Sequence, residues 1–331
     1  MPATSDLVVK LEQSMESGRV VYYLDSIRWS GSREYTIPMG SRGSGLFANV
    51  YDLGRGLVLK VVYLTKSPSE KLDADARPKT PPDKFEAEAR IHEALSTLTD
   101  PPVCPRLVAW GIPKYVSDAT TDITYPPMGV LVMQSATGTA RDYLTETKSE
   151  DAILDYYTQV ATILTRLEPY KFNHRDLKSD NILYVMEDDK PVFLLADFGH
   201  ACATIDGTEL SGQLEVEETT GGCFRKSRDL AQLVFDSRRF LPEGSRIERF
   251  AQSLLVIGPG FPGRWEETYD YFDNKDIETP KTVPEKFLKA IADYRSDPEG
   301  FLAAASKPKR VRRPRTRRPK RRRKHTKRRR R

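Results

Sequence analysis

The sequence predicts an α+β protein with a small lobe, built on a five-stranded antiparallel sheet and one helix, and a larger, mainly helical lobe. Most of the short apolar runs typical of strands lie in residues 35–134, whereas from Glu150 onward most of the apolar patterning is helical. Residues 307–331, the basic tail, contain 18 Lys or Arg and no Asp or Glu, so they cannot bury a core and are expected to be disordered. The predicted domains are therefore an N-terminal extension (1–34), the small lobe (35–134), the large lobe (135–306) and the basic tail.

The net charge of +6 combines two regions of opposite charge. The basic tail holds 18 of the 53 Lys and Arg residues, which leaves 35 against 47 Asp and Glu in residues 1–306, a net charge of −12. Because 38% of the 331 residues are apolar, the part before the tail can bury a substantial core. This excludes a disordered, collagen-like or small disulfide-stapled protein.

The cysteines and the hydropathy pattern bear on the compartment. Cys104, Cys202 and Cys223 stand singly, without the C-x-x-C spacing of a metal or redox site, so a reducing compartment is expected. No apolar run approaches the roughly 18 residues of a membrane span, and Met1–Lys10 carries an acid where a secretory signal has a basic flank. We therefore expect an intracellular protein with no membrane partner.

The small lobe begins with three predicted strands, Glu34–Pro38, Phe47–Leu53 and Gly56–Leu64. Leu53-Gly54-Arg55-Gly56 predicts a tight hairpin between the last two, because glycines adopt the positive φ angles that such turns require. Residues 65–82 are rich in Pro, Lys, Asp and Ser without apolar periodicity, so they predict an exposed loop.

A helix is predicted over residues 84–97, where apolar residues approximate a helical stripe. Asp83 followed by Glu86 fits a capping box at its start. Two further strands, Arg106–Trp110 and Gly129–Met133, complete the sheet, and the lobes are expected to meet near Gln134.

The most informative motif lies in the large lobe. Phe172–Leu183 reads FNHRDLKSDNIL, and Leu-Leu-Ala-Asp-Phe-Gly follows from Leu194 to Gly199, after a strand-like run. These two segments resemble the catalytic loop and the magnesium-binding loop of eukaryotic-type protein kinases. Asp-Phe-Gly alone would be weak, because it is common at strand ends, but the eight-residue match from His174 to Asn181 makes a coincidence improbable.

Phosphoryl transfer needs a carboxylate for the hydroxyl proton, a cation near the moving phosphate and oxygen ligands for magnesium. The resemblance implies that Asp176 orients the substrate hydroxyl and takes its proton, and that Lys178 neutralises the transferring phosphate. It further implies that Asn181 and Asp197 hold magnesium. His174 is expected to pack inside the core, and His92 and His200 lack partners at ligand spacing.

The resemblance also demands a Gly-rich loop and a lysine upstream. Gly43, Gly45 and Val50 align with G-x-G-x-x-G-x-V, with Ala48 in place of the third glycine, so this loop is expected to cover the ATP phosphates and adenine. Lys60, in Val-Leu-Lys, would bind the inner phosphates. The alternatives are an ordinary turn for the loop and an edge-strand solubility lysine for Lys60.

Lys60 needs a carboxylate from the predicted helix, where Glu86, Glu88 and Glu93 are the candidates. We choose Glu88, because family members place this residue three positions before an inward-facing apolar residue, here Ile91. The hinge between the lobes would comprise Met133, which gates the pocket, and Gln134 to Ala136, whose backbone would meet the adenine edge.

Beyond the metal loop the resemblance weakens. The Ala-Pro-Glu that usually closes the next segment is absent between Gly199 and Asp229. Asp229 resembles the aspartate that braces the catalytic loop from a buried central helix; the alternative is an acid favoured by a helix N-terminus. The abbreviated remainder resembles kinases of large DNA viruses.

The resemblance implies a serine/threonine protein kinase that uses ATP and magnesium on a protein substrate. The basic tail contains no aromatic residue, so it is expected to bind nucleic acid or another polyanion without sequence preference, or to serve nuclear targeting. The nucleus, the cytoplasm and a virion are all consistent locations. The alternatives are a pseudokinase scaffold, a polyanion-binding packaging protein with a kinase-like domain and a small-molecule phosphotransferase.

Overall fold

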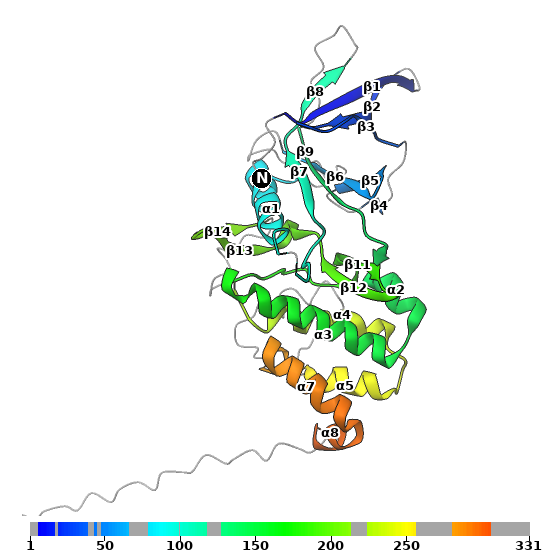
Figure 1. The fold of residues 1–331 in the computed structure, drawn as a ribbon, viewed down its shortest axis with the longest axis vertical. Coiled ribbons are helices and arrows are strands. Elements are labelled where there is room, and N and C mark those ends of the chain that lie inside the picture. Colours follow the sequence, from blue (N-terminus) through cyan, green and yellow to red (C-terminus); the bar gives the residue numbers. More distant parts are fainter. Residues whose placement is uncertain are drawn as a thin grey trace, which may run out of the picture.

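The chain is described by a computed structural model, which shows an α+β architecture (Figure 1). The residues that the structure describes are 6–16, 19–38, 43–44, 48–65, 79–98, 100–117, 127–212, 224–255 and 280–305. Two sheets lie in the upper part of Figure 1 and the longer helices in the lower part, with α1 (Pro82–Leu95) beside the sheets. The basic tail and residues 39–42 and 45–47 of the Gly-rich segment before β5 lie outside the described residues.

The five-stranded sheet is antiparallel, with the strand order β4-β5-β6-β9-β7. Four of its strands lie within one residue of the predicted bounds at either end, and Gly54, Arg55 and Gly56 all have the positive φ angles expected of the hairpin. The strands are β4 (Gly43–Ser44), β5 (Ala48–Gly54), β6 (Leu57–Tyr63), β7 (Leu107–Gly111) and β9 (Met128–Gln134). Lys60 lies in the middle strand, opposite Val50 and Leu131, and is thus held on a rigid element.

The predicted first strand, Glu34–Pro38, is wrong as a member of this sheet. Only β3 (Tyr35–Thr36) forms there, and it pairs with β2 (Arg19–Arg28) in a second, four-stranded sheet of order β3-β2-β1-β8. The other two strands are β1 (Val8–Glu16) and β8 (Lys114–Ser117), which pair in parallel. No strand was predicted for residues 1–33, so β1 and β2 were not expected.

The second sheet packs on the five-stranded sheet through an apolar layer. Val9, Leu11 and Ile27 of the second sheet are buried in one core with Leu59 and Val130 of the first. In the first half of β1 the buried Val9 and Leu11 alternate with the more exposed Val8, Lys10 and Glu12, as expected for a strand with one buried face. The strands β1 and β2 are therefore part of the folded upper region of the molecule, because their buried residues complete this layer.

Helix α1 packs on the other face of the five-stranded sheet. Phe85 lies against Gly129, where an added Cβ would come within 2.5 Å of the Phe85 ring, so this close approach requires glycine. The predicted capping box is wrong: the helix begins at Pro82, and its N-cap is Pro81 without a side-chain cap hydrogen bond. Asp83 thus lies inside the first turn, where its charge favours the helix dipole without capping it.

The lower part of the molecule has the helical core that the sequence predicts from Glu150 onward (Figure 1). Its helices are α2 (Ala140–Thr147), α3 (Glu150–Leu167), α4 (Arg228–Ser237), α5 (Arg246–Leu254), α7 (Pro284–Ser296) and α8 (Pro298–Ala305). The strand β10 (Gly138–Thr139) precedes α2, and four strands follow α3: β11 (Ile182–Glu187), β12 (Lys190–Leu195), β13 (Cys202–Ile205) and β14 (Thr208–Ser211). Ile91 and Leu95 of α1 reach into this core, so α1 joins the two parts.

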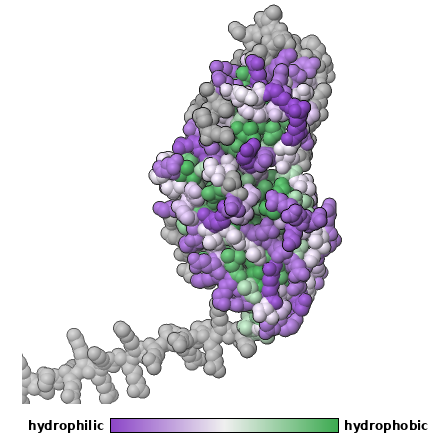
Figure 2. All heavy atoms as spheres, viewed as in Figure 1, coloured by the Kyte–Doolittle hydropathy of each residue, from purple (hydrophilic) through white to green (hydrophobic). Residues whose placement is uncertain are grey.

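The expectations also concern the surface and the cysteines. Hydrophilic residues cover most of the face in Figure 2, with small hydrophobic areas between them. None of the helices in the described ranges has the length and apolar character that crossing a membrane requires. Cys104 is a buried free thiol and Cys202 is disulfide-bonded, whereas Cys223 lies outside the described residues.

Candidate active site

Helix α4 contacts the loop that carries the predicted catalytic residues. The Asp229 carboxylate accepts hydrogen bonds from the backbone N–H groups of His174 and Arg175, at 2.7 and 3.0 Å. The His174 ring is fully buried, and its Nε2 contacts the Ala196 carbonyl at 2.8 Å. The bracing contact predicted for Asp229 and the core position predicted for His174 are therefore present.

Three of the predicted functional side chains meet on this loop. The Lys178 ammonium lies 2.8 Å from Asp176 Oδ2. The Asn181 amide donates to the Asp176 carbonyl at 2.9 Å and to Asp176 Oδ2 at 2.8 Å. Because two donors orient it, the Asp176 carboxylate is held in one position, as a general base requires.

Lys60 joins the sheet, α1 and the metal loop. Its ammonium lies 2.6 Å from Glu88 Oε1 and 2.8 Å from Asp197 Oδ1. The predicted choice of Glu88 over Glu86 and Glu93 is the pairing that the structure contains. Asp197 has a φ of 61°, a left-handed conformation that is uncommon for aspartate. Packing thus maintains a strained backbone at the residue predicted to bind metal.

The charges of Lys60, Glu88 and Asp197 depend on one another. Burial alone would lower the pKa of the Lys60 ammonium, but the Asp197 and Glu88 carboxylates outweigh it and raise that pKa above its ordinary value. Partial burial alone would raise the pKa of Asp197, whose side chain is half exposed, but the Lys60 charge holds that pKa below its ordinary range. Burial raises the pKa of Glu88 despite the opposing effect of Lys60. Lys60 is therefore a permanent cation at neutral pH, suited to phosphate oxygens.

The donor set fits a magnesium ion shared with a nucleotide. Asn181 and Asp197 offer the amide and carboxylate oxygens that magnesium binds, and magnesium commonly takes only one or two protein carboxylates besides phosphates and waters. Within the described ranges, no group of three or more His, Cys, Asp and Glu side chains could hold a metal. A magnesium ion here would therefore need further oxygen ligands from the nucleotide.

The Gly-rich loop and the hinge are placed only in part. Gly43 pairs with Val50 across β4 and β5, next to the Val50–Lys60 pair, while Gly45 lies outside the described residues. At the hinge Met133 is buried, but the Gln134 N–H donates to the Arg106 carbonyl at 3.0 Å. That donor is therefore not free to meet an adenine edge. A Gln134 contact to adenine would have to use the carbonyl.

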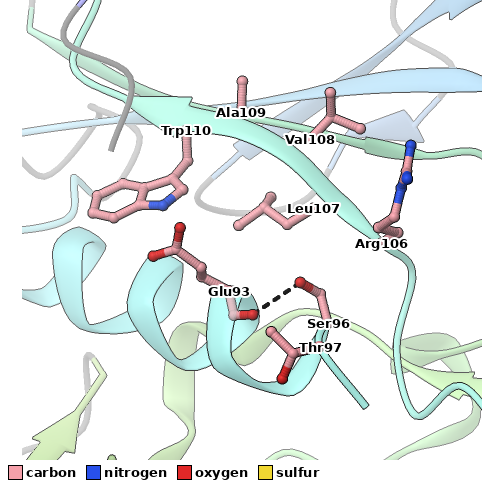
Figure 3. Close-up of a pocket in the computed structure, with 8 residues that line it drawn as sticks. All are labelled: Glu93, Ser96, Thr97, Arg106, Leu107, Val108, Ala109 and Trp110. Carbon is pink, nitrogen blue, oxygen red and sulfur yellow. Dashed lines mark hydrogen bonds between the residues drawn. The ribbon is translucent and has the colours of Figure 1, made fainter. Parts of the chain in front are cut away.

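A separate pocket of about 200 Å³ lies between the end of α1 and β7 (Figure 3). It is lined by Glu93, Ser96, Thr97, Arg106, Leu107, Val108, Ala109 and Trp110. None of the predicted site residues is among these. Glu93, one of the alternatives for the Lys60 partner, lines this pocket instead.

Asn173 is a buried contact residue that the sequence analysis missed. Its backbone exchanges two hydrogen bonds of 2.9 Å with Cys202, and its side chain both accepts from the Arg225 N–H and donates to the Arg225 carbonyl. The same amide also donates to Asp229 at 3.1 Å. Asn173 thus joins the catalytic loop to segments before and after residues 213–223, which lie outside the described residues. No local signal predicts these contacts, because the partners are 29 and 52 residues away in the sequence.

The Phe198 ring, next to Asp197, lies in a cluster of aromatic side chains. It contacts the rings of His92, His174 and Phe172, with centroids 5.2, 5.7 and 6.0 Å away. His92 Nε2 contacts the Pro105 carbonyl at 2.8 Å, and burial lowers the pKa of His92 to about 4. His92 is therefore a neutral structural residue that connects α1 with Phe198 and Pro105.

We expect His92 to make the protein less stable in acid. Because its pKa is about 4 in the fold and 6.5 when unperturbed, the unfolded state takes up the proton first, so stability is lost as the pH falls below about 6.5. The loss from this group between pH 7 and pH 4 should be about 3 kcal/mol. Urea unfolding of the wild type and His92→Leu at several pH values measures it. Parallel losses in both proteins would show that His92 is not responsible.

No protein-family model and no curated protein matches the chain. Its function must therefore be argued from the site. The site brings together a carboxylate oriented by two donors, a lysine beside it, a second lysine paired with two carboxylates and two oxygen donors for a cation. These groups can position a nucleotide's phosphates next to a hydroxyl and accept the hydroxyl proton.

Proposed function

We propose that the chain is an ATP- and magnesium-dependent serine/threonine protein kinase with a bilobal kinase fold. One observation carries the proposal: contacts of 2.6 to 2.9 Å assemble six predicted residues from four separate segments of the chain into two clusters, and a 2.9 Å hydrogen bond from the Ala196 N–H, next to Asp197, to the Asn181 carbonyl links the clusters. These are Lys60, Glu88, Asp176, Lys178, Asn181 and Asp197. Unrelated residues that match a motif by chance would not be expected to meet in this way.

The chain's residues have distinct tasks in such a reaction. Lys60, held by Glu88, would bind the inner phosphates of ATP, and Asp176 would take the proton of the attacking hydroxyl. Lys178 would shift from Asp176 toward the transferring phosphate as negative charge develops there. Magnesium, held by Asn181 and Asp197, would neutralise the phosphate oxygens when bound.

Lys178, two residues after Asp176, favours serine or threonine over tyrosine, because tyrosine-directed relatives usually have a different loop here. The pseudokinase alternative is disfavoured because no catalytic position is lost. A small-molecule phosphotransferase remains an alternative because the Ala-Pro-Glu element is missing. An assay with radiolabelled ATP, magnesium and basic, acidic and small-molecule acceptors tests all three. Label on peptide serine or threonine supports the proposal, label only on the small molecule favours the phosphotransferase, and no transfer to any acceptor contradicts both enzymes.

The 18 cations of the basic tail support a second function, binding of nucleic acid without sequence preference. If the tail neutralises about eight phosphates, the slope of log affinity against log salt should be about −7, a loss of roughly four decades between 50 and 200 mM salt. The change is truncation after Ser306, which leaves α8 whole. DNA and RNA affinities at several salt concentrations, measured beside peptide phosphorylation, give the result.

The matched control is Lys289→Gln, which removes one exposed charge from the body and leaves the basic tail intact. It should bind nucleic acid as the wild type does. Binding that survives truncation would exclude the tail as the binding element. A large rise in activity on a neutral peptide after truncation would instead mean that the tail folds back and masks the substrate cleft of the acidic body.

A further inference from the structure

Helix α4 carries two buried carboxylates, Asp229 and Asp236, each 2% exposed. They are seven residues apart, which is nearly two full helical turns, so both lie on the same face of α4. Asp229 contacts the beginning of the catalytic loop through His174 and Arg175. The contacts of Asp236 lie at the other end of the loop.

Asp236 holds Ser179. One carboxylate oxygen, Oδ2, accepts from the Ser179 backbone N–H at 2.7 Å and from the Ser179 hydroxyl at 2.6 Å. Ser179 directly follows Lys178 and lies two residues before Asn181. The two carboxylates of α4 therefore hold the loop on both sides of Asp176 and Lys178.

The energetic cost of Asp236 makes a purely structural role a poor explanation. Asp229 lies in the first turn of α4, where the helix dipole favours an anion, but Asp236 lies in the last turn, where the dipole opposes it. A buried anion is also costly to desolvate, and an apolar residue of similar size often stabilises as well or better. Asp236 is compensated by the two Ser179 bonds and by the Arg239 guanidinium, which also contacts Asp180 at 3.3 Å. The contacts of Asp236 with Ser179 and Arg239 therefore fix the position of the catalytic loop.

We propose that Asp236 is a positioning residue for phosphoryl transfer. By fixing Ser179, it sets where the neighbouring Lys178 and Asn181 stand relative to Asp176. The inference rests on the proposed kinase function and adds a residue to that site. Misplacing reacting or metal-binding groups by about 1 Å, or removing a residue that orients a metal ligand, commonly costs 10- to 100-fold.

The first test is Asp236→Asn, which keeps the volume and removes the charge. We expect kcat to fall by about 10- to 100-fold, the magnesium concentration for half-maximal activity to rise several-fold, and the KM for the peptide to change by less than about twofold. Ser179→Ala removes only the hydroxyl bond, so its effect should be smaller. Because both changes act on one contact, the double variant should fall little below Asp236→Asn alone.

The matched control is Val234→Ala, a buried apolar residue on the same helix. It should lower the melting temperature, because a core methyl pair is lost, without changing the magnesium dependence. If Asp236→Asn behaves like Val234→Ala, with lower stability but unchanged kcat and magnesium dependence, Asp236 is merely structural and the proposal is wrong. Fully additive effects of Ser179→Ala and Asp236→Asn would also contradict it.

Amide hydrogen exchange separates this proposal from the proposed function. Asp236→Asn should speed exchange in peptides covering residues 174–183 more than Val234→Ala does at equal distance from the melting temperature. Faster exchange in Asp236→Asn, combined with a wild type that transfers no phosphate, would mean that Asp236 anchors the loop but the kinase function is wrong. If the wild type transfers phosphate but Asp236→Asn leaves the exchange of residues 174–183 unchanged, the role of Asp236 is wrong and the kinase function stands.

Discussion

Asp176→Ala is expected to lower kcat by roughly 100- to 10,000-fold, the range that general-base and positioning effects commonly contribute. The physical reason is that Asp176 is the carboxylate oriented by both Lys178 and Asn181, at 2.8 Å each. Alanine removes the proton acceptor and the group that orients the hydroxyl. Steady-state kinetics with labelled ATP measure the loss, and the melting temperature shows whether the variant is folded.

The control for this variant is Asp293→Ala, an exposed aspartate on α7 whose ion pair with Lys289 is a surface contact. It should retain wild-type kcat. Unchanged activity in folded Asp176→Ala would refute the assignment of Asp176, whereas equal losses in both variants would point to an indirect effect of the charge change.

Asp197→Asn is expected to abolish magnesium-dependent nucleotide binding while harming stability much less. A carboxylate is the hard, charged ligand that magnesium prefers, and an amide brings no charge to hold it. The side chain is half exposed, so losing its ion pair with Lys60 should cost little in the unfolding free energy. Thermal melting with ATP, with and without magnesium, measures both effects, because a ligand at 100 times its Kd stabilises by about 2.7 kcal/mol.

Asp206→Asn, in the turn between β13 and β14, is the matched control for this variant. It makes the same chemical change at an exposed position and should show the wild-type melting shift. Equal magnesium–ATP shifts in the wild type and Asp197→Asn would favour the pseudokinase alternative, because the nucleotide would then bind without its expected metal ligand.

Local patterns predicted much of the small lobe. The β5–β6 hairpin, β7, β9 and the extent of α1 agree with the sequence to within about two residues, because turn glycines and apolar periodicity act over neighbouring positions. The errors have local causes too. Pro81 and Pro82 moved the helix start and displaced the expected capping box, and Tyr35–Thr36 was assigned to the wrong sheet because strand propensity does not specify a partner strand.

The sequence by itself determined the candidate chemistry: the spacing of Asp176, Lys178 and Asn181 within one loop, and the metal-loop aspartate after β12. The choice of Glu88 rested on the resemblance, and the tertiary structure contains that pair. Only the tertiary structure decided that β1 and β2 cover the sheet and that Asp236 holds Ser179. The physical reason is the range of the forces involved. Neighbouring residues choose their backbone conformation by local sterics and hydrogen bonding, but contacts across 28 or 57 residues exist only after the packed core has fixed both partners.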